Sequence, residues 1–144
     1  MLTIALKDGI EKIAQESRMS NINLCNIERL SYDDIKEYAQ GYNITAKQHI
    51  QDEKEAGYLL AHEIGYTLLY GSRKEAKIFP YAYTEKELAA SYFARAFLLP
   101  KEQFIDVVLS NTYYTICNYV KVADWFNVSE SMVLARGRDL ELWE

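Results

Sequence analysis

The sequence has few residues that break helices and few that build disulfide or metal frameworks. Its 144 residues include only 2 prolines, 6 glycines, 2 cysteines and 2 histidines. Cys25 and Cys117 lie far apart and lack C-x-x-C spacing, which argues against a disulfide framework and against a cysteine zinc site. We therefore expect two reduced thiols.

Clustered positive charge and long hydrophobic runs are also missing. The net charge of −5 argues against a dominant nucleic-acid or anionic-membrane surface. No apolar run approaches the roughly 20 residues that a membrane span requires. The first residues, MLTIALKDGIEKIAQE, lack the order of a secretion signal. These absences predict a soluble, cytoplasmic protein that does not use a membrane or nucleic acid as its partner.

Apolar residues recur mostly at spacings of three and four, which predicts a mainly helical protein. The length fits one domain over residues 1–144 that needs no structural metal to fold. The expected helices run from a cap at Asp8 to about Met19, from Ser31 to Gly41, from Asp52 to about Tyr70, and from Thr84 to Pro100. The segment YNITA and the residues around Ile78 and Phe79 have strand character. The predicted class is α+β, with a small sheet of two or three strands beside the third helix.

The third predicted helix carries the stretch LLAHEIGYTLLYGS, Leu59 to Ser72. His62 and Glu63 begin an H-E-x-x-H pattern, but Tyr66 stands where the second histidine belongs. Residues four apart lie on one helix face, so two such histidines grip zinc while the glutamate takes a proton from zinc-bound water. A third ligand must come from elsewhere, and Glu87 is well placed in the first turn of the next helix.

A His-Glu pair alone is weak evidence for a metal site. Locally, His62 fits a histidine at the rim of the core and Glu63 a solvated carboxylate. The two helices together carry more information. LLAHEIGYTLLY followed by ELAASYFARAFLLP resembles the ImmA/IrrE family of zinc metallopeptidases, whose signatures run L-A-H-E-[LI]-G-H-x-L-L-H and E-x-E-A-N-x-F-A-x-x-L-L-x-P. The matching residues are Ala61, His62, Glu63, Ile64, Gly65, Leu68, Leu69, Glu87, Ala90, Phe93, Ala94, Leu98, Leu99 and Pro100.

This resemblance implies a zincin-like fold with zinc as cofactor. By it, His62 is the first zinc ligand, Glu63 the general base and Glu87 the third ligand. It also implies a repressor-like protein of a phage or mobile element as substrate or partner. The departures are Tyr66 at the second ligand, Tyr70 at a further histidine, Ala89 at a glutamate and Ser91 at an asparagine.

Tyr66 predicts an impaired metal site, because a phenol with a pKa of about 10 is a poor zinc ligand at neutral pH. We predict less than stoichiometric zinc, with the ring of Tyr66 filling the space of an imidazole and its hydroxyl bonded to Glu87 or Glu63. Two alternatives stay open, zinc bound by a Tyr66 phenolate and zinc bound by His49 from an earlier segment.

Three functions compete for this sequence. The first is a metallo-endopeptidase acting on a repressor, impaired by Tyr66. The second is an inactive relative, a pseudoenzyme that binds a protein such as a repressor or a toxin–antitoxin component. The third takes VADWFNVSESMVLARGRDL as a DNA-reading helix-turn-helix. Residues 118–144 hold three basic and five acidic residues, so we expect instead a helix-turn-helix-like cap with Trp125 and Phe126 buried.

Overall fold

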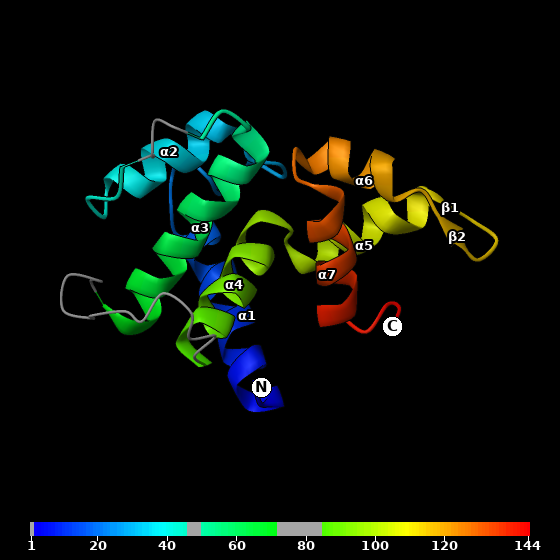
Figure 1. Cartoon of the computed structure of the whole chain (residues 1–144), viewed down its shortest axis with the longest axis horizontal. Helices are drawn as coiled ribbons and strands as arrows, with labels where there is room; N and C mark the ends of the chain where they lie inside the picture. The colour runs from blue at the N-terminus through cyan, green and yellow to red at the C-terminus, as the bar shows by residue number, and fades with distance from the viewer. Residues whose placement is uncertain (1, 46–49, 72–84) are drawn as a thin grey trace.

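Helices dominate the computed structural model, which describes residues 2–45, 50–71 and 85–144 (Figure 1). The elements are, in chain order, α1 (Ile4–Met19), α2 (Tyr32–Gln40), α3 (Glu53–Tyr70), α4 (Glu85–Leu98), α5 (Lys101–Ser110), β1 (Thr112–Tyr113), β2 (Ile116–Cys117), α6 (Tyr119–Phe126) and α7 (Glu130–Asp139). The predicted class, mainly helical with a small sheet, is confirmed. None of the helices in the described ranges has the length and hydropathy to cross a bilayer.

Local capping explains where the first three helices begin. The Ser31 hydroxyl accepts from the Asp34 amide, and the Asp34 carboxylate accepts from the Ser31 amide, which forms a capping box at the start of α2. Asp52 caps α3 as predicted. The predicted cap at Asp8 is wrong, because α1 begins at Ile4, where the Thr3 hydroxyl accepts from the Leu6 amide at 3.2 Å.

The strand predicted at YNITA is wrong for its described residues, Tyr42 to Thr45. The chain turns there, because the Tyr42 amide donates to the Ala39 carbonyl and Asn43 takes the left-handed conformation at φ 59°. The strand predicted around Ile78 and Phe79 lies outside the described residues.

The observed sheet is an antiparallel pair in which Thr112 faces Cys117 and Tyr113 faces Ile116. It connects α5 to α6 and lies far from α3 (Figure 1), whereas the sequence placed the sheet beside that helix. A two-residue loop without glycine gives a weak hairpin signal, which is why the segment was not recognised.

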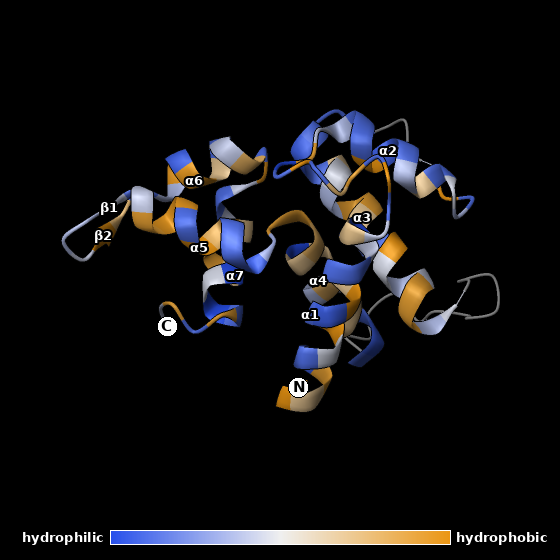
Figure 2. Cartoon of the chain, turned by 180° about the vertical axis from the view of Figure 1, so that it is seen from behind, coloured by the Kyte–Doolittle hydropathy of each residue, from blue (hydrophilic) through white to orange (hydrophobic). Residues whose placement is uncertain are grey.

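Helix α4 is the centre of the fold, because it packs against both α1 and α3, while α2 covers α3 on the other side (Figure 1). Eight side chains of α4 are buried: Ala89, Ala90, Tyr92, Phe93, Ala94, Ala96, Phe97 and Leu98. A helix buried on most of its circumference belongs to the interior of a domain. By contrast, hydrophilic and hydrophobic residues alternate along α1 and α2 (Figure 2).

The C-terminal helices fold back onto this core. Asn127 ends α6 in the left-handed conformation, and Ser129 caps α7 by accepting from the Met132 amide. Phe126 is buried as predicted, but the predicted burial of Trp125 is wrong. The Trp125 ring lies on the surface under the guanidinium of Arg29, whose Cζ is 4.1 Å from the ring centroid.

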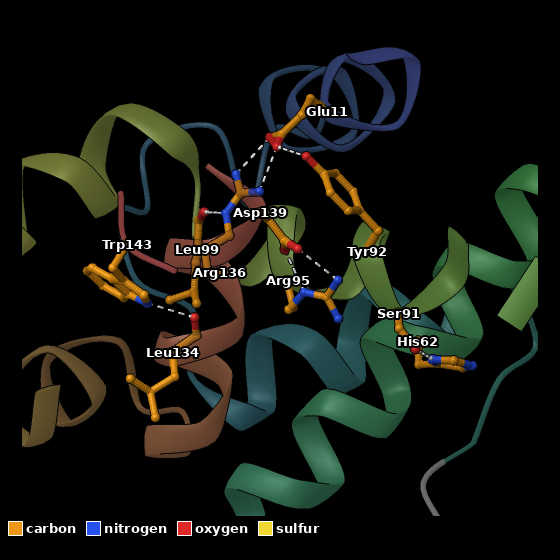
Figure 3. A network of polar contacts seen from close by, with 10 residues as sticks. All are labelled: Glu11, His62, Ser91, Tyr92, Arg95, Leu99, Leu134, Arg136, Asp139 and Trp143. Atoms are coloured by element: carbon orange, nitrogen blue, oxygen red, sulfur yellow. Dashed lines mark hydrogen bonds and ion pairs between the residues drawn. The ribbon is translucent and has the colours of Figure 1, made fainter. Parts of the chain in front are cut away.

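An ion pair with a buried guanidinium holds α7 against α1 (Figure 3). Arg136 donates to both carboxylate oxygens of Glu11 at 2.6 and 2.7 Å, and to the Leu99 carbonyl at 2.9 Å. The Tyr92 hydroxyl donates to the same carboxylate at 3.0 Å. These charge-assisted bonds link α1, α4 and α7 through one carboxylate.

Candidate active site

The His-Glu motif lies in the middle of α3. Both ends of this helix are well defined. The Asp52 carboxylate accepts from the Lys54 amide at 2.9 Å, and Gly71 ends the helix at φ 87°. Because an α-helix repeats every 3.6 residues, His62 and Tyr66 project from one face while Glu63 is turned by about 100°. Glu63 is half-buried.

Gly65 allows α3 and α4 to approach closely at this point. A Cβ atom at Gly65 would lie 2.5 Å from Cδ1 of Phe93 and 2.8 Å from its Cβ. Carbon atoms in contact normally stand about 3.5 to 4.0 Å apart, so a larger residue would push the helices apart. The glycine of the HEIGY sequence therefore sets the spacing that the site needs.

This spacing brings His62 and Glu87 into direct contact. The Nε2 atom of His62 lies 2.8 Å from Oε2 of Glu87, and its Nδ1 atom lies 3.2 Å from the hydroxyl oxygen of Ser91 (Figure 3 shows the second contact). Both contacts are hydrogen bonds in the tautomer in which Nε2–H donates to the carboxylate and Nδ1 accepts from the hydroxyl. The imidazole is then fully hydrogen-bonded, and it joins α3 to α4.

The contact with Ser91 was not expected from the sequence. Ser91 is one of the departures from the family signature, at the position of an asparagine. Its position four residues after Glu87 was the available signal, since residues at that spacing share a helix face. The serine and the glutamate therefore reach the same imidazole ring from neighbouring turns of α4.

Tyr66 is buried one turn after His62, and its ring lies against that of Tyr70 with centroids 5.6 Å apart. Burial raises the pKa of the Tyr70 phenol, and the Glu85 carboxylate and Tyr66 raise it further. Tyr70 is therefore protonated at neutral pH and offers no anionic ligand. The expected hydrogen bond from the Tyr66 hydroxyl to Glu87 or Glu63 stays a prediction.

The described residues do not fit a three-ligand zinc site. Two atoms bound to one tetrahedral zinc at about 2.0 to 2.1 Å stand roughly 3.3 Å apart. The 2.8 Å between Nε2 and Oε2 is shorter than this and lies within the range of a hydrogen bond. Among the described residues, no group of three His, Cys, Asp or Glu side chains could hold a metal. His49 lies outside them.

A family model matches most of the chain. The model described as Peptidase_M78, IrrE N-terminal-like domain, matches residues 21–137. This range includes both motif helices and also α2, which precedes the segment where the sequence resemblance was noticed. Neither the curated proteins nor the solved structures contain a match.

Proposed function

The chain belongs to the IrrE N-terminal-like family of M78 peptidases, and on this premise we propose that it is a regulatory protein which binds a repressor-like protein or peptide without zinc-dependent hydrolysis. Its candidate site keeps the first and third ligand positions of the family, His62 and Glu87. It lacks a histidine at the second position, where Tyr66 is buried.

The observation that carries the proposal is the 2.8 Å hydrogen bond between His62 and Glu87. It gives Nε2 of His62 and Oε2 of Glu87 a partner without a metal. A hydrolytic zinc site needs three protein ligands and one open position for water. In the proposed state, Glu63 keeps its carboxylate, but there is no metal-bound water for it to deprotonate.

Charge supports a protein rather than DNA as the partner. Of the three basic residues in 118–144, Arg136 is fully buried and paired with Glu11. Only Lys121 and Arg138 remain to contact phosphates on the α6–α7 surface, too few for the dense contacts that duplex binding uses. We place the protein and its repressor-like partner in the cytoplasm.

A second candidate is the metallo-endopeptidase of the family. It is favoured by the meeting of His62 and Glu87 across two helices with Glu63 one residue away. In that case Tyr66, as a phenolate, would be the missing ligand. The two candidates differ in their zinc content.

Zinc analysis of the purified protein separates them. We expect well below one zinc per wild-type chain, and close to one zinc per chain in Tyr66→His, which completes H-E-x-x-H. Tyr70→His is the matched control, because it adds an imidazole one turn further along without filling the second-ligand position. Its zinc content should equal that of the wild type. Stoichiometric zinc in the wild type that disappears in Tyr66→Phe would establish the phenolate site instead.

A further inference from the structure

The β1–β2 hairpin presents hydrophobic side chains where a small sheet normally presents polar ones. Side chains directly opposite each other in an antiparallel pair point to the same face. Thr112 and Cys117 share one face, and Cys117 packs against the core. Tyr113 and Ile116 share the other face and are 81% and 74% exposed. A sheet with one solvated face usually places polar residues there.

Further exposed hydrophobic residues flank the hairpin strands in the sequence. Leu109 at the end of α5, Tyr114 in the loop and Val120 in α6 are all exposed. We call these three residues, together with Tyr113 and Ile116, the hairpin patch. The segment 107–120, VVLSNTYYTICNYV, contains no Asp, Glu, Lys or Arg. The hairpin projects from one end of the molecule, and β2 is hydrophobic (Figures 1 and 2).

The backbone at the tip adds a second observation. In the two-residue loop, Tyr114 has φ 57°, and Thr115 is not among the residues with positive φ. This is the pattern of a type II′ loop, whose first central position strongly favours glycine. A bulky residue with positive φ is strained. Because the Tyr114 side chain is 99% exposed, packing within the chain does not explain why it is there.

We propose that the hairpin patch is the interface through which two copies of this chain form a symmetric dimer. Such an interface uses the same surface on both copies, so it must be complementary to itself. A chain of net charge −5 repels its copy over most surfaces, but the uncharged segment 107–120 brings no like charges together. The strand edges also carry no charged residue or proline that would block pairing with another strand.

The side chains of the hairpin patch offer a large part of the area that a dimer interface buries. Tyrosine side chains bury about 150 to 250 Å² each when covered, and two are available at the tip. With the three aliphatic side chains, the patch approaches the roughly 800 Å² per partner of a standard interface. An acidic chain without basic residues in this segment is less suited to an anionic lipid surface.

Sedimentation over a range of protein concentrations tests the proposal with the full chain. The wild type should form dimers, and Ile116→Lys should raise the dimer dissociation constant at least about tenfold. Ile22→Lys is the matched control, since Ile22 is 88% exposed in the α1–α2 connection, outside the patch. It should dimerise like the wild type. A monomeric wild type at every concentration, or equal dimerisation of both lysine variants, would overturn the proposal.

Tyr114→Gly separates dimerisation from a purely structural role of the tip. Glycine adopts positive φ freely, so the melting temperature of the monomer should stay the same or rise. The dimer should nevertheless weaken, because an interface aromatic is lost. Unchanged dimerisation in this variant would contradict the role of Tyr114. Sedimentation of a monomeric wild type with neutral phospholipid vesicles would assign the patch to a membrane and overturn the dimer.

Discussion

Gly65 shows how a single residue controls the geometry of the candidate site. Its missing side chain leaves room for the Phe93 ring, and this contact fixes the distance between α3 and α4. Any change in that distance also changes the contact between His62 and Glu87, which lie on the same two helices.

We predict that Gly65→Ala destabilises the protein by about 1 to 3 kcal/mol, because the new methyl group overpacks the helix interface. Chemical denaturation measures this loss. Gly9→Ala is the control, since nothing lies within 4 Å of a Cβ atom at Gly9 in α1. That change should be neutral or stabilise by up to about 1 kcal/mol. Equal effects at the two glycines would refute the role of close packing.

The protonation of His62 gives a second prediction at this scale. If Nε2–H donates to Glu87 and Nδ1 accepts from Ser91, the imidazole is the Nε2–H tautomer. Nitrogen-detected NMR distinguishes the two tautomers, and only 2 histidines are present to assign. Ser91→Ala should leave the Nε2 proton in place. A proton on Nδ1 would instead fit a metal on Nε2, and would contradict the hydrogen-bonded pair.

At the scale of elements, α7 is held in place through Arg136, which is fully buried and bonded to Glu11 and Leu99. We predict that Arg136→Met destabilises the protein by about 3 to 5 kcal/mol, because it leaves the Glu11 carboxylate partly buried without its partner. Arg138→Met, two residues further and exposed, should stay within about 0.5 kcal/mol of the wild type. Thermal or urea unfolding measures both, and similar losses would exclude a special role for Arg136.

The same pair predicts how stability depends on pH. Burial by itself raises the pKa of Glu11, but the hydrogen bonds and charge of Arg136 outweigh it and lower the pKa below 4.5. A carboxylate with a lowered pKa in the folded state stabilises the protein above its unfolded pKa, and this contribution is lost as the pH falls through the folded pKa. The stability difference between the wild type and Glu11→Gln should therefore shrink in acid below about pH 4.5. A constant difference would disprove the linkage.

At the scale of the whole molecule, the size of the hydrophobic core predicts a fold that does not depend on a metal. The core cluster joins α1 to α4 with the C-terminal helices. A chain of this length buries enough surface to fold without a metal staple. We predict that a chelator such as EDTA leaves the melting temperature of the wild type unchanged. A decrease that added zinc reverses would show that zinc stabilises the native fold.

Much of the fold was predictable because helix caps and sequence motifs depend on residues a few positions apart. The helix starts at Ser31 and Asp52 depend on hydrogen bonds within one helical turn, and both were predicted. The family was also recognised from the two motif helices. The predicted start of α1 was wrong because both Thr3 and Asp8 are residues that can cap a helix. The strand predicted at YNITA was wrong because backbone hydrogen bonds to the end of α2 hold these residues in a turn.

The sequence by itself determined that His62 and Tyr66 share a helix face, that Tyr66 replaces a ligand, and that Glu87 begins the next motif. Helical spacing fixes directions, but it does not fix the distance between two helices. Only the packing of Phe93 against Gly65 decided that His62 meets Glu87 at 2.8 Å and Ser91 at 3.2 Å. Likewise, Arg136 meets Glu11 across 125 positions of the chain, because burial of a charge requires a partner from wherever the fold can supply one.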